Sequence, residues 1–485
     1  MENLNQFIVE KKKRPIKILQ FGDGNFLRAF VEWVLQCAND QGFINTNVAV
    51  VRPLERGKVK VSDLKQQDGL YTLYLQGMQQ GEMISQKSVI DVLGDFINPY
   101  TEYEGYLKYA ESEELRFIIS NTTEAGIVLD SKDTVLDQCP NSFPGKLLAL
   151  LFRRYKHFRG DYSKGLILLP CELIDHNGAE LKKVLNELAA INHLDSEFLN
   201  WLNEANTFCD TLVDRIVPGY PKDEIEQRTK ELGYIDYFVV KGEVFHLWVI
   251  QAGDEVAKEF PVNRANLNIL FVEDLAPYKE RKVRILNGAH TALVPVAYLY
   301  GIDTVKEAVE DPIVGTFLQH IIFQEIIPTL NLPQNELDQF AKDVLERFKN
   351  PFIRHELLSI ALNATTKYKT RNLPSVLQYI EKKGSLPKGL IFSLAALLVF
   401  FKGKRGEQDI LLQDNPEFLE LYKKLWAKYD GSYTSVKKLV EEFLGLKSHW
   451  GVDLNTIEGF KGAVSENVYA ILSEGMETSL KRVIS

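Results

Sequence analysis

A short apolar run that ends at a glycine and is followed at once by helical periodicity places the strongest constraint on this fold. Ile16–Phe21 has the length and apolar character of a buried strand, and Gly22 ends it. From Phe26 to Cys37 apolar residues recur at three- and four-residue steps, as on one face of a helix. Asn47–Val51 has the pattern of the next strand. Strands that alternate with helices predict a parallel sheet with right-handed crossovers.

The alternation continues through the first half of the chain and then stops. Leu115–Ser120 and Leu166–Pro170 are further short apolar runs, and residues 237–271 are rich in strand-like patterns. After about residue 275 long helical patterns dominate. We therefore predict an α/β protein, with a doubly wound parallel sheet in a domain of residues 1–272. A mostly α-helical domain would occupy residues 273–485.

Charge excludes one broad class of function. The net charge of −9, from 57 basic and 66 acidic residues, argues against a general nucleic-acid binder, because phosphate contacts need a basic face. A locally basic pocket for a small anion is still compatible with this charge. The basic run Lys11–Arg14 is expected to be a solvated tail ahead of the first strand, with a localisation signal as the weaker alternative.

Cysteine spacing and hydropathy exclude further classes. The four cysteines form no CxxC pair and the histidines show no metal-ligand spacing, so we expect neither a disulfide framework nor a metal site. The longest apolar run, residues 389–401, is shorter than the roughly 20 residues that span a bilayer, and we expect a buried helix there. With no apolar N-terminal leader visible, these features predict a soluble cytoplasmic protein without a membrane or nucleic-acid partner.

The turn after the first strand has the character of a dinucleotide-binding loop of the Rossmann type. Gly22 permits a tight turn, and Gly24 lets the backbone approach a pyrophosphate at a helix N-terminus. Leu27 replaces the third glycine of the fingerprint, so a plain turn is the alternative. The acidic residue that usually follows the second strand is absent, and Arg52 stands there instead. An arginine at this place can hold the 2′-phosphate of NADP, stack on adenine or be exposed, so the residues alone leave the cofactor open.

One segment of the second half carries the strongest catalytic signal. Pro277 suits the first turn of a helix, and at about 100° per residue Lys282, Asn287 and His290 would share one broad face. A partly desolvated lysine can act as a general base, and an amide and an imidazole can stabilise a developing alkoxide during hydride transfer. The alternative is an amphipathic helix with an exposed lysine and a satisfied histidine. Gly288 inside such a helix suggests that something approaches the backbone closely.

Several motifs resemble those of the mannitol dehydrogenase family of polyol-specific long-chain dehydrogenases. Lys282-x4-Asn287-x2-His290 resembles its catalytic signature, and Gly22–Ala29 resembles its cofactor loop. Further similar motifs occur in the expected order, namely Asp68–Thr72, Ser120–Gly126, Phe143–Lys146 and Val213–Pro218. The resemblance implies an N-terminal Rossmann domain, a helical C-terminal domain and metal-independent hydride transfer between a nicotinamide cofactor and a secondary alcohol.

The resemblance also implies roles for individual residues. Lys282 would be the general acid/base, and Asn287 with His290 would polarise the reacting oxygen. The expected cofactor-binding residues are Phe21, Gly22, Asp23, Gly24, Asn25, Phe26, Arg52, Asn121 and Thr122. The expected substrate-contacting residues are Asp214, Glu172, His355, Lys367 and Arg371.

Members of this family act on free polyols, on mannitol 1-phosphate, on fructuronate or on tagaturonate. The polyol members carry an Arg-Ile-x-x-Asp-Gly-Ser-x-Lys stretch, whereas the aligned residues here run from Ser359 to Lys367 and lack the arginine. The neighbouring residues are basic, among them His355 and Arg371, and a uronate needs a cation for its carboxylate, ideally an arginine. A solvated basic helix end is the alternative for these side chains.

Within the family, the motifs at residues 350–357 and 367–374 most resemble the members that interconvert altronate and tagaturonate. That resemblance implies NAD as the cofactor, despite Arg52, and a sugar acid as the small-molecule substrate. We expect a monomer or a small homo-oligomer. The alternatives are a fructuronate reductase or a polyol dehydrogenase of the same family and, from another class, a protein that senses the nicotinamide cofactor without turnover.

Overall fold

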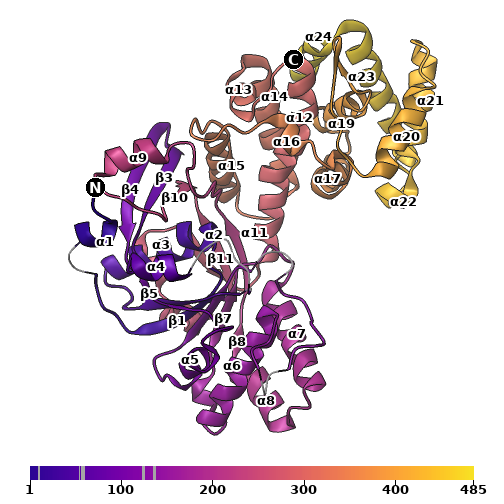
Figure 1. The fold of residues 1–485 in the computed structure, drawn as a ribbon. Coiled ribbons are helices and arrows are strands. Elements are labelled where there is room, and N and C mark those ends of the chain that lie inside the picture. The colour runs from indigo at the N-terminus through magenta and orange to yellow at the C-terminus, as the bar shows by residue number, and fades with distance from the viewer. Residues whose placement is uncertain (9–10, 54, 56–60, 123–125, 135–137) are drawn as a thin grey trace. The chain divides into compact units, whose positions relative to one another are not determined.

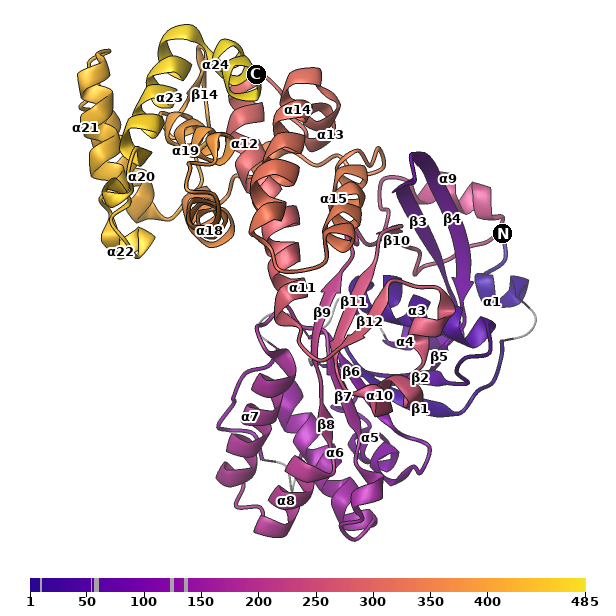
Figure 2. The same ribbon diagram turned by 180° about the vertical axis from the view of Figure 1, so that it is seen from behind.

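The chain forms two compact units in a computed structural model that describes residues 1–8, 11–53, 55, 61–122, 126–134 and 138–485. The first unit comprises Met1–Gly77 and Met83–Leu275, and the second comprises Met78–Glu82 and Ala276–Ser485. Figures 1 and 2 show the elements of both units from opposite sides. The second unit thus includes a short segment from the first half of the chain. A single boundary between residues 272 and 273, as the sequence predicts, leaves this segment in the first domain.

A six-stranded parallel sheet forms the centre of the first unit (Figure 1). Its strands lie in the order β5-β2-β1-β6-β7-β8, and every neighbouring pair is parallel. Counted along the chain within this sheet, the order is 3-2-1-4-5-6, which is that of dinucleotide-binding doubly wound folds. The predicted doubly wound sheet is therefore confirmed. The strands are β1 (Ile16–Phe21), β2 (Asn47–Val51), β5 (Leu93–Ile97), β6 (Phe117–Ser120), β7 (Ile167–Pro170) and β8 (Thr207–Phe208).

The strands are apolar because helices cover both faces of the sheet. Leu19 and Phe21 of β1 belong to a core that includes residues of α5, α6, α7 and α8, whereas Ile18 belongs to a second core that includes residues of α3. Alternate residues of one strand thus supply two different cores. The helices of the first unit are α1 (Leu4–Phe7), α2 (Asn25–Ala29), α3 (Val31–Asp40), α4 (Val61–Gln66), α5 (Tyr103–Leu107), α6 (Phe143–His157), α7 (Asn177–Ile191), α8 (Ser196–Glu204), α9 (Ile225–Leu232) and α10 (Asp254–Glu259).

The helix predicted after the glycine turn is in fact two helices. α2 and α3 are separated at Phe30, whose φ of −127° and ψ of −79° are not helical. The carbonyl oxygens that precede the break accept hydrogen bonds from distant side chains. The Tyr71 hydroxyl donates to Arg28 O at 2.7 Å, and Arg215 Nη1 donates to Ala29 O at 2.6 Å. The expectation of one helix is wrong, because apolar periodicity indicates which residues are buried but does not predict hydrogen bonds from distant side chains to the backbone.

Two three-stranded sheets accompany the large one. The strand-rich stretch predicted over residues 237–271 supplies β10, β11 and β12, which are divided between them. Their orders are β10-β3-β4 and β12-β11-β9, and β9 runs antiparallel to β11. Their strands are β3 (Tyr71–Gln79), β4 (Glu82–Ile90), β9 (Asp210–Asp214), β10 (Val240–Glu243), β11 (Leu247–Gln251) and β12 (Ile269–Val272).

The basic run ahead of the first strand is only in part the solvated tail that the sequence predicts, because Lys12 and Lys13 are exposed whereas Lys11 and Arg14 are not. The Arg14 side chain is 6% exposed, and its Nη1 lies 2.9 Å from Oδ1 of Asp91. The Lys11 ammonium donates to the carbonyl oxygens of Asp68 and Leu93, and burial lowers the pKa of Lys11. Lys11 and Arg14 are bound by acceptors from later segments of the chain, and the local charge of the run does not predict such tertiary contacts.

The second unit is mostly helical and is built around an apolar helix. In α19 every residue from Gly389 to Phe400 is buried, which confirms the buried helix predicted for this run. It packs against α12 and α23. The carboxylate of Glu325 accepts hydrogen bonds from the backbone N–H groups of Gly389 at 2.7 Å and Leu390 at 2.8 Å. These are N–H groups that the first turn of a helix cannot pair internally.

The other elements of the second unit are mostly helices as well. Among the described residues no helix has both the length and the apolar character that crossing a membrane requires. A two-stranded sheet, β13 (Lys404–Arg405) and β14 (Gln408–Asp409), follows the buried helix. The helices are α11 (Ala276–Arg281), α12 (Ala289–Tyr300), α13 (Val305–Glu310), α14 (Pro312–His320), α15 (Gln334–Phe348), α16 (Leu357–Ile360), α17 (Ala364–Arg371), α18 (Leu373–Lys383), α19 (Lys388–Phe400), α20 (Pro416–Trp426), α21 (Tyr433–Leu444), α22 (Lys447–Trp450), α23 (Phe460–Glu474) and α24 (Met476–Ile484).

A segment from the first half of the chain is hydrogen-bonded within the second unit. The backbone N–H groups of Gln80 and Gly81 donate to the carboxylate of Glu346 on α15, at 3.0 and 2.8 Å. These two residues lie in the turn between β3 and β4. The turn is therefore part of the second unit, although β3 begins and β4 ends in the first.

His246 should make the first unit sensitive to acid. Its Nε2 accepts a hydrogen bond from Asn268 N at 2.9 Å, and its Nδ1 lies 3.2 Å from Val244 O, an arrangement that fits a neutral ring protonated on Nδ1. Burial lowers the pKa of His246 to about 3. The unfolded chain takes up this proton below about pH 6.5 and the folded protein does not. Each pH unit down to about 3 should therefore remove up to about 1.4 kcal/mol from the free energy of unfolding.

The measurement is urea unfolding of the parent and of His246→Gln between pH 5 and pH 7.5. The variant should lose less stability than the parent as the pH falls, because it has no imidazole to protonate in the unfolded state. The exposed His157→Gln serves as the matched control and should retain the parent's slope. Equal slopes in the parent and in His246→Gln would contradict the prediction.

Candidate active site

The three candidate catalytic residues lie on one continuous helical stretch that is not α-helical throughout. α11 passes into a π-helical segment, Lys282–Gly288, which continues directly as α12. Lys282 and Asn287 are half-buried on this segment, and His290 lies in the first turn of α12. The predicted step of 100° per residue does not hold here, because a π-helix bonds each N–H five residues back instead of four. The expectation of a regular α-helix over this stretch is therefore wrong, and short π-helical insertions are frequent at functional sites.

Gly288 closes the π-helical segment where another part of the chain comes close, as the sequence predicts. Its carbonyl oxygen accepts a hydrogen bond from Asn372 Nδ2 at 2.9 Å. A Cβ at position 288 would lie 3.4 Å from Arg371 O and 3.5 Å from Asn372 Nδ2. This approach brings the end of α17, with Arg371, against the stretch that carries Lys282, Asn287 and His290.

His290 lies among aromatic and basic side chains. Its ring stacks on Phe348 with a centroid distance of 4.0 Å and meets the ring of His355 edge-on at 5.2 Å. Burial lowers the pKa of His290 well below its ordinary value, and the nearby His355, Arg347 and Arg371 act in the same direction. Its Nε2 is buried without a hydrogen-bond partner among the described residues. A neutral imidazole with one unsatisfied buried nitrogen suits a hydrogen bond to a ligand.

Two cations of α17 join this group. Arg371 Nη1 donates to Thr291 Oγ1 at 3.3 Å, and the same hydroxyl donates to the backbone oxygen of Asn287 at 2.9 Å. Lys367 Nζ donates to Ile360 O at 2.9 Å. Burial lowers the pKa of both cations, and the charge of Arg371 lowers the pKa of Lys367 further. Positive charge is thus concentrated beside His290.

Two other basic residues of this region interact with groups other than His290. Arg354 is exposed and paired with Glu356, and Lys369 lowers the pKa of His449, a residue outside the group. The structure therefore brings together His290 with three of the predicted substrate residues, which are His355, Lys367 and Arg371. Arg347, Phe348 and Thr291 also belong to the group. Sequence reasoning missed them because nothing in their local pattern separates them from ordinary helix residues.

The glycine loop of the first unit lies where the strand order of the large sheet reverses, between β1 and β6. Gly22 has a φ of +125°, and a Cβ there would lie 2.7 Å from Asn121 O, so only glycine fits. At Gly24 no atom lies within 4 Å of the place that a Cβ would take. Open space before this backbone is what the approach of a pyrophosphate needs. These residues therefore fit a dinucleotide.

The side chains next to this loop differ in whether they can contact a ligand. Phe21 is buried with its ring 4.9 Å from that of Phe143, so only its backbone can face a ligand. Asn25 Oδ1 accepts a hydrogen bond from Arg28 Nη2 at 2.5 Å, and Phe26 is half-buried. Two other predicted cofactor residues, Asp23 and Arg52, are half-buried just beyond β1 and β2.

Glu172 and Thr122, both predicted to contact a ligand, bond to each other. The backbone N–H and the hydroxyl of Thr122 donate to Glu172 Oε1 at 3.0 and 2.9 Å, and Ser120 Oγ donates to Oε2 at 3.0 Å. Glu172 is 2% exposed, and burial raises its pKa. In this structure its carboxylate is bonded to the end of β6 and the loop that follows, and it does not face a ligand. Asn121 Nδ2 donates to Cys171 O at 2.7 Å.

Asp214, another predicted substrate residue, is the last residue of β9 and is 6% exposed. Thr123, Glu124 and Ala125, in the motif that begins at Ser120, lie outside the described residues. Among the described residues, no group of three or more His, Cys, Asp or Glu side chains is placed to hold a metal ion.

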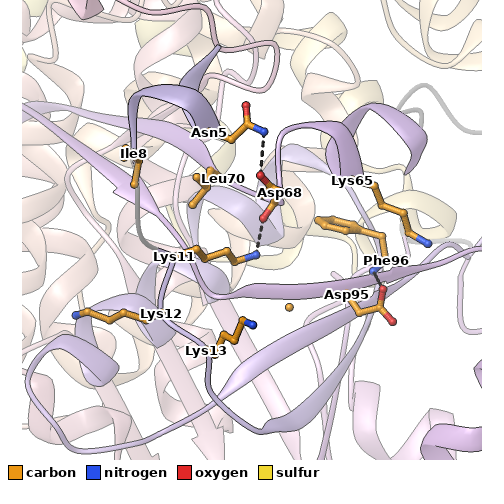
Figure 3. A pocket seen from close by; sticks show the side chains of 11 residues that line it. Asn5, Ile8, Lys11, Lys12, Lys13, Lys65, Asp68, Leu70, Asp95 and Phe96 are labelled. Atoms are coloured by element: carbon orange, nitrogen blue, oxygen red, sulfur yellow. Dashed lines mark hydrogen bonds between the residues drawn. The ribbon is translucent and has the colours of Figure 1, made fainter. Parts of the chain in front are cut away.

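A pocket of about 1040 Å³ lies elsewhere in the first unit and is lined by four lysines, Lys11, Lys12, Lys13 and Lys65 (Figure 3). Lys12 and Lys65 point in opposite directions and are paired with other acidic residues. The pocket lies beside β5 and the N-terminal segment. Ligands of doubly wound sheets bind beyond the carboxyl ends of the strands, so we do not assign the candidate site to this pocket.

Solved structures with a similar fold include two polyol dehydrogenases. A D-sorbitol dehydrogenase in substrate-free form aligns with a TM-score of 0.80 and 23% identity, over 96% of this chain and 95% of the other. Pseudomonas fluorescens mannitol 2-dehydrogenase, in a ternary complex with NAD and D-mannitol, aligns with a TM-score of 0.66 and 22% identity, over 97% and 94%. At these identities the likeness shows the fold alone.

Curated relatives are similar over the whole length of the chain. It is 46% identical over 486 residues to an altronate oxidoreductase of Phocaeicola vulgatus, which covers 100% of both chains. It is 47% identical over 483 residues to an altronate oxidoreductase of Bacillus subtilis (strain 168), over 99% of this chain and 98% of the relative. The family model of the mannitol dehydrogenase Rossmann domain matches residues 16–264, and that of the mannitol dehydrogenase C-terminal domain matches residues 274–472. The resemblance seen in the sequence motifs is confirmed, and the chain belongs to the mannitol dehydrogenase family.

Proposed function

We propose that this protein is an NAD-dependent altronate oxidoreductase that interconverts D-altronate and D-tagaturonate. The observation that carries the proposal is the basic group around the neutral His290, in a chain 46–47% identical over its full length to proteins of that name. A sugar acid offers a carboxylate that such a group can bind, and a free polyol does not. We further propose that the enzyme works in the cytoplasm as a monomer or a small homo-oligomer, without a nucleic-acid or membrane partner.

Lys282 is the general acid/base of the proposed reaction. In the oxidative direction a secondary alcohol of altronate loses a hydride from carbon and a proton from oxygen. NAD supplies the hydride acceptor when it is bound. Lys282 takes the hydroxyl proton, and it returns a proton to the oxygen in the reductive direction. Altronate and NAD⁺ thus give tagaturonate, NADH and one proton.

Asn287 and His290 stabilise the oxygen on which negative charge develops. The Asn287 amide and an N–H of the neutral His290 imidazole donate hydrogen bonds to it. The buried Nε2 of His290, which has no hydrogen-bond partner among the described residues, supports this role. Stacking on Phe348 and the edge contact with His355 fix the plane of the ring.

The substrate carboxylate is bound by the cations of α17. Arg371 forms the principal ion pair, and Lys367 adds a second positive charge. Burial lowers the pKa of His355, so at neutral pH this ring is a neutral hydrogen-bond donor. Asp214 stays a predicted substrate contact, which rests on the resemblance of the Val213–Pro218 motif to the family.

NAD is held by the carboxyl edge of the large sheet. The open space before Gly24 supports an approach of the pyrophosphate to the backbone there. Gly22, Asn25 and Phe26 flank that space, and Phe21 contributes backbone alone. We assign Glu172 and Thr122 to positioning the loop that carries Asn121, because their polar groups bond to each other.

The test is NADH oxidation followed by absorbance, with tagaturonate, fructuronate and fructose compared side by side and NADPH as the control. Turnover of tagaturonate far above the other two is the expected result. Fructuronate as the best substrate would replace the proposal with the fructuronate reductase alternative. Fructose as the best substrate would contradict the carboxylate site and leave the role of Lys282 intact. Tight NADH binding without turnover of any of the three would favour the cofactor-sensing alternative.

A further inference from the structure

We propose that Asp23 has the role of the acidic residue that usually follows the second strand and is absent here, and that it makes this enzyme prefer NAD to NADP. Its carboxylate would balance the charge of Arg52 and accept a hydrogen bond from the adenosine ribose. This inference rests on the proposed function. It also explains how an enzyme with an arginine at this position can use NAD.

Strand pairing places the two residues at one edge of the sheet. β1 and β2 run parallel with Phe21 opposite Val51, and Gly22 N donates to Val51 O at 3.2 Å. Asp23 is the second residue after β1 and Arg52 is the first after β2. Neighbouring strands lie about 4.8 Å apart, so both side chains start from adjacent points of the carboxyl edge.

Charge and burial link the same two residues. Asp23 is half-buried, and its Oδ2 is buried without a hydrogen-bond partner among the described residues. Burial raises the pKa of Asp23, and the charge of Arg52 is the largest of the influences that lower it, ahead of Arg28. Arg28 is also engaged elsewhere, because its Nη1 donates to Phe238 O at 3.0 Å. The charge of Arg52 thus acts on Asp23 more strongly than that of Arg28 does.

The two cofactors differ at the ribose that this edge receives. NADP carries a phosphate on the ribose 2′-oxygen, and NAD carries a hydroxyl there. In doubly wound folds this ribose lies beyond the second strand, where an arginine alone would attract the phosphate. A carboxylate beside the arginine offsets that attraction and repels the phosphate. The unsatisfied Oδ2 can accept a hydrogen bond from a 2′-hydroxyl, which NADP lacks.

The experiment measures the dissociation constants of NADH and NADPH by fluorescence titration, without any sugar substrate. Asp23→Asn keeps the shape of the side chain and removes its charge. It should shift the ratio of the two constants towards NADPH by about tenfold, the size expected when a charge-assisted hydrogen bond is lost. The double variant Asp23→Asn/Arg52→Gln should lose most of the gain, because Arg52 no longer attracts the phosphate. Asp254→Asn, which removes an exposed charge at the start of α10, is the matched control and should leave the ratio unchanged.

The outcomes separate this inference from the proposed function. An unchanged ratio in Asp23→Asn, or equal weakening of both cofactors, would overturn the role of Asp23. Asp23→Glu keeps the charge, and retention of the NADH preference in that variant would support a charge effect over a purely structural one. A parent protein that binds neither dinucleotide would overturn the proposed function itself.

Discussion

Replacing Lys282 with alanine is expected to lower the turnover of tagaturonate by a factor of about 10³, because general acid–base groups contribute 10²- to 10⁴-fold. NADH binding should be little changed, since we assign the cofactor to the glycine loop of the first unit. Steady-state turnover and NADH titration on the same preparations measure the two quantities. A loss of turnover with intact cofactor binding would identify Lys282 as the proton-transferring residue.

Two further variants test whether the loss of turnover comes from the loss of a base or from the loss of a positive charge. Lys282→Arg keeps the positive charge but cannot serve as a base near neutral pH, so it should be almost as inactive as the alanine variant. Lys306→Ala removes an exposed lysine of α13 that is ion-paired with Glu310 and should behave like the parent. Substantial turnover in Lys282→Arg would show that charge alone is needed and would contradict the acid/base assignment.

Replacing Arg371 with leucine is expected to raise the KM for tagaturonate and to lower kcat/KM by about 10²-fold. Hydrogen bonds to charged groups are worth about 1.5–3 kcal/mol, and 1.4 kcal/mol corresponds to a factor of ten. The burial of Arg371 beside His290 and Thr291 supports an effect at the upper end of that range. Any activity with fructose, which has no carboxylate, should fall much less.

The control for this variant lies on the same helix. Lys369→Gln removes a positive charge from α17, but the charge of Lys369 acts on His449, outside the group around His290, so kcat/KM should change little. Equal losses in Arg371→Leu and Lys369→Gln would mean that the region acts only through its net charge. Equal losses of tagaturonate and fructose activity in Arg371→Leu would point to a general disturbance of the site.

The sequence predicts the elements that carry a local signal. Strands β1, β2, β6 and β7 of the large sheet and the apolar helix α19 lie in apolar runs, and the sequence indicates them correctly. The sheet's β5 and β8 have no such run, and the sequence does not predict them. The glycine turn is equally local, because a φ of +125° at Gly22 requires glycine. The similarity of several motifs to one family also indicates that a Rossmann domain comes first in the chain and a helical domain follows it.

What the sequence could not predict depends on contacts between distant residues. The break at Phe30 depends on hydrogen bonds from Tyr71 and Arg215, and the engagement of Glu172 depends on Ser120 and Thr122. The π-helical segment has no signature in apolar periodicity, since one widened turn leaves the pattern of buried residues almost intact. Phe348 next to His290 is likewise a product of tertiary packing.

The turn between β3 and β4 has a consequence for how the protein can be made. Its Gln80 backbone bonds to Glu346, which the ribosome adds 266 residues later. The chain therefore enters the second unit, returns to the first and enters the second again. During synthesis the first unit emerges with this turn still lacking its partner, and Glu346 becomes available to the turn only after α15 has left the ribosome. A gene cut between residues 275 and 276 would yield a C-terminal fragment without a piece that its own fold uses.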